Sequence, residues 1–341
     1  MNMGKRAGPP AYDDRRVTTP FEIGEIFPEE AAGPVRLPRR QAGSSPQGLA
    51  VTVLADYTLR TRAWLPSAAL VALLAESGVS HAGARAAVSR LARRGALEGR
   101  RQGRHSWYRL TDGTAAGLSA GGRWVVASMT DPPAWDGLWT LVAFSLPKDL
   151  DVQRRALRGQ LRWLGYAPLY DGLWLSPHDV THTTTDQLAR LTQGTVTVFR
   201  ARHVDLAATV GRAPLDAWDI GAIAGHYAEF VRRWNALLPR IRSGGLGGAD
   251  AVRARTEVMD TYRRFPVLDP QLPLDLLPPG WLRAPAAEVF AAVYDGLAEP
   301  AQAHVRSVAA RFGDDGTAGV AAHSVAELLA GVRGPVSRCP G

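Results

Sequence analysis

Three short apolar helical patterns followed at once by a basic hairpin constrain the fold of this 341-residue chain more than any other feature. The helical patterns cover residues 49–59, 65–78 and 80–95, and the third begins at Ser80, a typical N-cap residue, and stops at a glycine. The stretch "LEGRRQGRHSWYRL" then alternates around Gln102-Gly103, which predicts two strands joined by a tight turn. This order of elements predicts a winged helix-turn-helix, in which the third helix lies in the major groove of DNA.

The third helix is expected to have one apolar face and one small, basic face. At 100° per residue its apolar side chains fall on one side, while the arginines and a serine fall on the other. Residues 49–113 hold ten arginines against four carboxylates, a net charge of +6, whereas the net charge of the whole chain is +8. A positive surface of this kind indicates a polyanionic partner, although an ordinary basic surface on a helical domain is the alternative.

Nine side chains are expected at the DNA surface. An arginine fork can bond guanine O6 and N7 together, so base edges or nearby phosphates are the predicted partners of Arg85, Ser89 and Arg90, with His81 beside them. Phosphate contacts position a protein without reading sequence. They are expected from Arg93, Arg100, Arg101, Arg104 and His105.

The rest of the chain divides by composition. Residues 1–47 are rich in proline and predict a disordered arm, in which Arg39 and Arg40 belong to a solvated linker or touch a phosphate backbone. The winged helix-turn-helix is expected over residues 48–120, ending in a glycine-rich joint, "TAAGLSAGG". Residues 121–212 have a βαβ pattern, a further helix around 184–191 and a strand at 195–201, which together suggest a ferredoxin-like α+β domain.

The C-terminal third is expected to be mostly helical. Apolar residues repeat at helical spacing from Ile220 to Trp234, and further helices are expected over 249–264 and 285–298. Prolines interrupt the intervening stretch, which predicts an ordered strap rather than a helix. The helical domain is therefore placed at 213–300, with a low-complexity tail and possible short helices over 301–341, and the fold class is α+β.

Three blocks of sequence occur in order along the chain: "RAAVSRLARRGALEGRRQGRHSWYRLT", "WDGLWTLVAF" with "LRWLGYAPLYDGLWLSPHD", and "YRRFPVLDPQLPLDLLPPGW". Together they resemble the PaaX-like family of transcriptional repressors of phenylacetic acid degradation. The resemblance covers residues 48–298 and implies a winged helix, a middle domain similar to small ferredoxin-like CRISPR-associated nucleases, and a helical C-terminal domain. It also implies a homodimer that an aryl-acyl-CoA effector, typically phenylacetyl-CoA, releases from a double-stranded DNA operator.

Catalytic chemistry has little support in the sequence. His178 and His182 flank Asp179 but follow a proline and lack a third ligand, so neither a metal nor a cofactor is expected. Asp136 lies near where nucleases of the similar fold carry a metal-binding aspartate, although a turn residue is the simpler interpretation. A nucleophile with its base, a phosphate loop and a dinucleotide fingerprint are all missing, which favours a regulator over an enzyme. The alternatives are a metal-dependent nuclease with a winged-helix delivery domain and an acyl-CoA-processing enzyme.

The sequence leaves the effector pocket unlocated. Tryptophans 135, 139, 163, 174, 218, 234 and 281 are candidates either for stacking on an aryl ring or for the core. Candidates for the CoA phosphates are Arg232, Arg233, Arg263 and Arg264. The single cysteine, Cys339, excludes an internal disulfide, and no run approaches the ~18 apolar residues of a membrane helix, so a cytoplasmic protein without membrane contact is expected.

Overall fold

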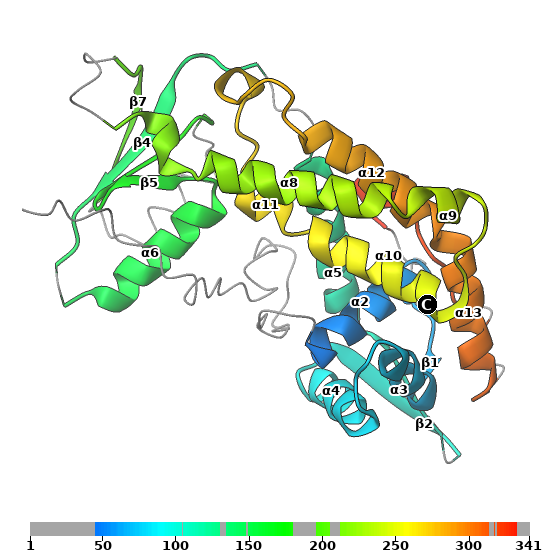
Figure 1. The fold of residues 1–341 in the computed structure, drawn as a ribbon. Helices are drawn as coiled ribbons and strands as arrows, with labels where there is room; N and C mark the ends of the chain where they lie inside the picture. Colours follow the sequence, from blue (N-terminus) through cyan, green and yellow to red (C-terminus); the bar gives the residue numbers. More distant parts are fainter. Residues whose placement is uncertain are drawn as a thin grey trace, which may run out of the picture.

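The computed structural model describes residues 45–103, 105–129, 134–147, 149–179, 196–204, 212–313, 317 and 319–332. It has an α+β fold with two small antiparallel sheets, one of three strands and one of four. The larger sheet lies at one end of the molecule, a bundle of helices extends from it, and a small helical region with a hairpin lies below the bundle (Figure 1). Arg39, Arg40, Arg104, His182 and the helix expected at 184–191 lie outside the described residues.

The N-terminal region has the three predicted helices and the hairpin. Ser45 caps the first helix by accepting the Gly48 N–H, so this helix begins at Pro46, two residues before the expected start of the winged helix at residue 48. Ser80 caps the third helix by accepting the Gly83 N–H at 3.1 Å, as predicted. The elements are α2 (Pro46–Thr58), β1 (Leu65–Pro66), α3 (Ser67–Glu76), α4 (His81–Arg93), β2 (Leu97–Gln102) and β3 (His105–Leu110), with the sheet order β1-β3-β2.

The glycine-rich joint expected after the hairpin is wrong, because this stretch is the body of a long helix, α5 (Asp112–Ala127). The Thr111 side chain caps the helix by accepting the Thr114 N–H. Leu328 packs closely on this helix: a Cβ on Gly122 would lie 2.7 Å from a methyl carbon of Leu328, whose side chain would have to shift. The domain boundary expected at residue 120 therefore falls inside a helix.

The middle region is a four-stranded sheet with α6 (Asp151–Trp163) packed on one face. Its strands are β4 (Trp139–Phe144), β5 (Ala167–Tyr170), β6 (Leu173–Ser176) and β7 (Val196–Ala201), in the order β5-β6-β4-β7, and each neighbouring pair is antiparallel. The expected second strand region is thus a hairpin, in which β6 lies between β4 and β5. Leu157 and Leu161 of α6 are fully buried in one cluster with Val142 and Trp174 of the sheet.

The helical bundle contains α8 (Ile220–Asn235), α9 (Leu238–Arg242), α10 (Gly248–Tyr262) and α12 (Arg283–Gly296). Stacked aromatic side chains fill its core, with the rings of Tyr262 and Phe290 centred 3.8 Å apart. The expected ordered strap is present as α11 (Phe265–Leu268) and η2 (Leu274–Leu276), and it buries Leu272 completely. No helix in the described part of the chain has the length and apolarity to span a membrane.

The expected low-complexity tail is only partly right. Residues 301–310 belong to α13 (Ala298–Ala310), in which Ala301, Val305 and Val308 are fully buried. A short helix does follow, α14 (Val325–Ala330), and it packs on α5. The Ala321 N–H also donates to the Tyr57 carbonyl at 2.9 Å. Alanine and glycine in this segment therefore permit close packing onto the N-terminal region.

A buried polar cluster joins the N-terminal region to the bundle. The fully buried Arg255 of α10 donates to the carbonyl oxygens of Tyr294 at 3.1 Å and His323 at 2.5 Å. The Tyr294 hydroxyl donates to Asp56 Oδ1 of α2 at 2.7 Å, and its oxygen lies 3.0 Å from His323 Nε2. Because that hydroxyl proton is committed to Asp56, His323 is the donor to Tyr294. Burial raises the pKa of Asp56, although Arg255 opposes the shift.

Neutral His323 is expected to make the fold sensitive to acid. Burial, and then the charges of Arg255 and Arg60, lower the pKa of His323 to about 3, from 6.5 in the unfolded chain. Its contribution to stability is complete above pH 6.5 and is lost as the pH falls toward 3. Urea unfolding between pH 7.5 and 5 should show the free energy of unfolding falling by up to about 1.4 kcal/mol per pH unit. His323→Gln should flatten this slope, and an unchanged slope in that variant would contradict the assignment.

Candidate nucleic-acid interface

Helix α4 presents the predicted basic row to solvent. Its apolar side, formed by Ala84, Ala87, Val88 and Leu91, is buried against the N-terminal core. Four of the predicted DNA contacts are exposed on the opposite side, namely His81, Arg85, Ser89 and Arg93. The fifth predicted contact on this helix, Arg90, is half-buried. The Ser80 cap fixes where the helix begins, and the helical period then places these side chains opposite the buried apolar side.

The hairpin register follows the predicted pattern. Leu97 pairs with Leu110 and both are buried, while Gly99 pairs with Tyr108 on the same face. A Cβ on Gly99 would lie 3.1 Å from the Tyr108 ring, so glycine lets that ring cross the strand. Gln102 pairs with His105, so the chain reverses after Gln102 rather than at Gln102-Gly103. Gly103 has a φ of +60°, a backbone conformation that suits glycine.

Successive hairpin arginines point to opposite faces. Arg101 is exposed on the side of Leu97, whereas Arg100 lies on the other side, since side chains alternate along a strand. The Arg100 guanidinium lies 4.8 Å from the centre of the Trp64 ring and 5.5 Å from that of Trp107. Arg100 and Arg101 therefore do not belong to one continuous face. All three predicted phosphate contacts of the hairpin that the structure describes are exposed, namely Arg100, Arg101 and His105.

Two arginines behind the hairpin are neutralised by carboxylates. Arg109 bonds Glu98 at 2.6 Å and stacks over Trp64 at 4.6 Å. Arg62 bonds Asp112 at 2.6 Å and also donates to the Leu110 carbonyl. The positive charge that is not paired with a carboxylate thus lies on α4 and on the exposed hairpin arginines Arg100 and Arg101, within the described residues. Arg94, at the C-cap of α4, is also exposed and was not among the predicted contacts.

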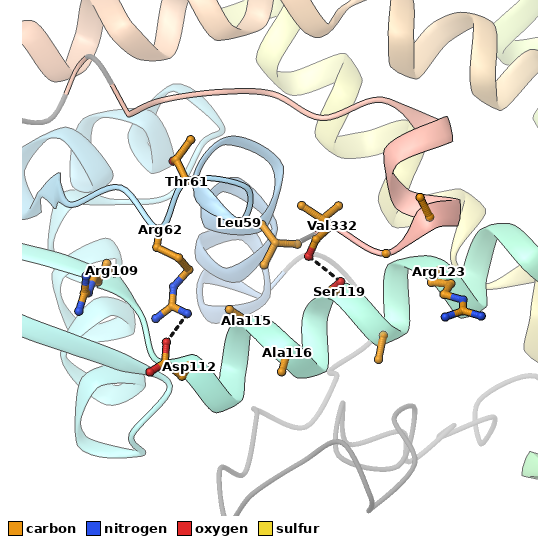
Figure 2. Close-up of a pocket in the computed structure, with 13 residues that line it drawn as sticks. Leu59, Thr61, Arg62, Arg109, Asp112, Ala115, Ala116, Ser119, Arg123 and Val332 are labelled. Carbon is orange, nitrogen blue, oxygen red and sulfur yellow. Dashed lines mark hydrogen bonds and ion pairs between the residues drawn. The ribbon is translucent and has the colours of Figure 1, made fainter. Parts of the chain in front are cut away.

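The C-terminal segment braces the base of the hairpin. Trp107 of β3 is buried, and a Cβ on Gly313 would lie 3.1 Å from its ring. A cavity of about 600 Å³ lies nearby between α5, the segment after α2 and residues 330–332. Figure 2 shows Ser119 of α5 bonded to the Val332 carbonyl, a 2.8 Å contact, at one side of this cavity. Trp64 and Trp107 are the supporting residues that sequence reasoning missed; the alternation that places Trp107 opposite Arg100 was the available signal.

Asp136 has protein partners on both carboxylate oxygens. Oδ1 accepts the Leu138 N–H at 2.9 Å and Oδ2 is ion-paired with Arg200. The Leu138 N–H and the Arg200 charge lower the Asp136 pKa. His178 Nε2 bonds the Pro270 carbonyl oxygen at 2.6 Å. Within the described ranges no three His, Cys, Asp or Glu residues are grouped to hold a metal ion.

The candidate arginines for CoA phosphates are all paired with carboxylates of the bundle. Arg233 bonds Glu257 at 2.5 Å and Arg264 bonds Asp260 at 3.0 Å. Arg232 pairs with Glu229, and Arg263 also pairs with Asp260. Of the candidate tryptophans, three are buried in the core, namely 139, 174 and 234. These four arginines therefore form helix-surface ion pairs rather than a converging anion site.

Comparisons with known proteins match most of the chain. Family models match as "PaaX-like protein" over residues 45–114, "PaaX protein central Cas2-like domain" over 132–211 and "PaaX-like protein C-terminal domain" over 218–307. Transcriptional repressor PaaX of Escherichia coli is 30% identical over 251 residues, which cover 71% of this chain and 76% of the relative. The solved structure of the uncharacterized protein Rv0674 from Mycobacterium tuberculosis has a similar fold, with a TM-score of 0.51 and 22% identity, over 77% of this chain and 99% of that chain. The chain therefore belongs to the PaaX-like family.

Proposed function

We propose that the protein is a DNA-binding transcriptional repressor of a phenylacetate-type catabolic operon. The observation that carries the proposal is the exposed basic row of α4, with Arg85, Ser89 and Arg93 opposite a fully buried apolar face. The repressor relative supports the same function. In this proposal Arg85, Ser89 and Arg90 meet base edges or nearby phosphates, with His81 beside them. Phosphates are the proposed partners of Arg93, Arg100, Arg101, Arg104 and His105.

The proposed arrangement is a winged helix at 48–120, a ferredoxin-like domain at 121–212 and a helical domain at 213–300. The strand order β5-β6-β4-β7 supports the second assignment, since the first and third strands of a βαββαβ unit lie side by side at its centre. Helix α5 packs against α14, and α13 packs against α3 and α10. These contacts favour domain boundaries that leave α5 and α13 whole, in place of cuts at residues 120 and 300. Residues 112–127 and 298–310 act in this arrangement as the connections between the winged helix and the rest of the protein.

A cytoplasmic homodimer would place two α4 helices in successive major grooves. The half-sites of a palindromic operator would then lie about 34 Å apart, or a multiple of one helical turn. An aryl-acyl-CoA such as phenylacetyl-CoA is the proposed effector, and it would bias the dimer away from this spacing. A coupling of about 1 to 3 kcal/mol, or about 5- to 150-fold in operator affinity, is sufficient for release.

The salt dependence of binding tests the proposed phosphate contacts. With five phosphates neutralised per subunit, the logarithm of the association constant should fall with the logarithm of salt concentration with a slope of about −4.5 per subunit. Fluorescence anisotropy with a duplex carrying the DNA upstream of the protein's own gene measures the slope. Arg101→Ala should make the slope shallower by about 0.9. A flat salt dependence would contradict an electrostatic DNA interface.

A gel shift on the same DNA tests the effector. Saturating phenylacetyl-CoA should weaken binding, whereas free CoA should leave it unchanged. Unchanged binding in both arms would remove the proposed effector and leave DNA binding intact. The nuclease alternative is not carried forward, because the relative is a repressor and Asp136 is occupied by Arg200 and the Leu138 N–H. The repressor relative favours a protein that is not an enzyme.

A further inference from the structure

A groove of about 950 Å³ separates the four-stranded sheet from the start of the helical bundle. One wall comes from α6, β5 and β6, and the other from η1 (Pro214–Ala217) and the first residues of α8. The groove therefore lies between two parts of the fold, a common position for small-molecule sites. Its side chains combine cations with aromatic rings: Arg158, Arg162, Arg212, Tyr170, Trp174 and Trp218.

Two of the three arginines make no ion pair with a carboxylate in the described part of the chain. Arg212 donates to the carbonyl oxygens of Leu169 at 2.7 Å and Asp216 at 2.8 Å, which fix its position and leave its charge in place. Arg162 is exposed, and its guanidinium lies 5.2 Å from the centre of the Trp174 ring. Arg158, by contrast, is paired with Asp171 at 2.5 Å.

The other two carboxylates of the groove have backbone partners. Asp219 Oδ1 accepts the Ala222 N–H as the cap of α8, and Asp216 Oδ2 accepts the Ala213 N–H. Both oxygens are thus held by the ends of helices rather than by Arg162 or Arg212. An incoming anion would meet two guanidiniums whose donors do not first have to leave a carboxylate.

Aromatic side chains supply the apolar part of the groove. Tyr170 is 56% exposed at its edge, and Trp218 stacks on Trp139 with their centres 6.2 Å apart. A planar apolar ring is therefore suited to this wall.

We infer that this groove binds a small molecule with an aromatic part and a phosphate-bearing part, with Arg162 and Arg212 at the phosphates. The inference rests on the proposed function in one respect: such a ligand is taken to be the effector. The cavity in Figure 2 suits this ligand less, because alanines form much of its lining and two of its three arginines, Arg62 and Arg109, are paired with carboxylates.

The position of the groove suggests how occupancy would reach the DNA-binding helices. Helix α8 begins at the groove and packs along α12 in the bundle (Figure 1). Tyr294 of α12 bonds Asp56 of α2 in the buried cluster, and α13 contacts α3. A ligand that changes the angle between the sheet and α8 would therefore act on helices that are joined to the winged-helix region.

Isothermal titration calorimetry of the full-length protein with phenylacetyl-CoA tests the groove directly. Removing one charge-assisted contact in Arg162→Gln should weaken binding about tenfold or more. Arg212→Gln should do the same, with circular dichroism confirming its fold because Arg212 also bonds two carbonyls. The control is Arg232→Gln, which removes an exposed, ion-paired arginine outside the groove and should bind like the wild type. Adenosine 3′,5′-bisphosphate should bind the wild type and lose affinity in Arg162→Gln.

The outcomes separate this inference from the proposed function. Arg162→Gln should keep the wild-type affinity for the upstream DNA while losing release by phenylacetyl-CoA. Wild-type ligand affinity in both groove variants would overturn the groove assignment. Binding of DNA without binding of either ligand probe would overturn the ligand class and leave the repressor proposal standing. Ligand binding that depends on Arg162 in a protein that fails to bind DNA would support the groove and contradict the repressor proposal.

Discussion

Arg283→Met is expected to lower the free energy of unfolding by about 3–5 kcal/mol. Arg283 and Asp269 form a fully buried ion pair, with Nε to Oδ2 at 3.0 Å and a terminal nitrogen to Oδ1 at 2.8 Å. Asp269 also accepts the Tyr227 hydroxyl and the Trp281 indole N–H. Without Arg283 the carboxylate would stay in the core with no compensating charge, which is the costly way to break such a pair.

Chemical denaturation at pH 7 measures this loss, and a matched surface variant calibrates it. Arg253→Met removes an arginine that is about half-exposed and paired with Asp250 on α10. Its effect should stay within about 0.5 kcal/mol, since exposed ion pairs contribute little. Equal effects of the two substitutions would contradict the structural role assigned to Asp269 and Arg283. Arg283→Met should also impair DNA binding only through loss of folded protein.

Local signals in the sequence predicted the N-terminal region well. The Ser80 cap, the helical period of α4 and the alternating hairpin each act within a few residues, so a short window of sequence contains them. The βαβ pattern likewise predicted β4 and α6. The ordered proline-rich strap followed from proline's fixed φ and missing N–H. These features owe little to distant parts of the chain.

Features that depend on distant packing were missed. The glycines of α5 suggested a flexible joint, but Gly122 lies within a helix against which Leu328 packs from a distant part of the sequence. Arg255 reaches Asp56 from 199 residues away, a contact that no local pattern indicates. The alanine-rich segment after residue 300 likewise suggested little regular structure. Small residues are common both in irregular segments and at close contacts between helices, so composition alone does not distinguish the two.

The charge of the hairpin was predicted better than its geometry. Arginines at neighbouring strand positions necessarily point apart, so Arg100 turns toward Trp64 while Arg101 stays on the opposite face. Trp64 lies before α3, and only the folded sheet brings it to the hairpin. The number of arginines in the sequence therefore overstates how many of them can face one DNA surface. The main candidates for DNA contact are Arg85 and its neighbours on α4.

Arg85→Ala is expected to weaken binding to the upstream duplex about 5- to 150-fold, which corresponds to about 1–3 kcal/mol for an arginine at a base edge. Arg85 is exposed in the middle of the α4 row and makes no ion pair within the described ranges, so its loss should not disturb the fold. Arg232→Ala, which removes an exposed arginine of the bundle, is the control for net charge.

Fluorescence anisotropy titration of wild type, Arg85→Ala and Arg232→Ala with this duplex and with an unrelated duplex tests the DNA interface most directly. The expected result is a loss of affinity in Arg85→Ala that is larger for the upstream duplex than for the unrelated one, with Arg232→Ala close to wild type. Equal affinities of Arg85→Ala and wild type for the upstream duplex would contradict recognition of DNA by α4.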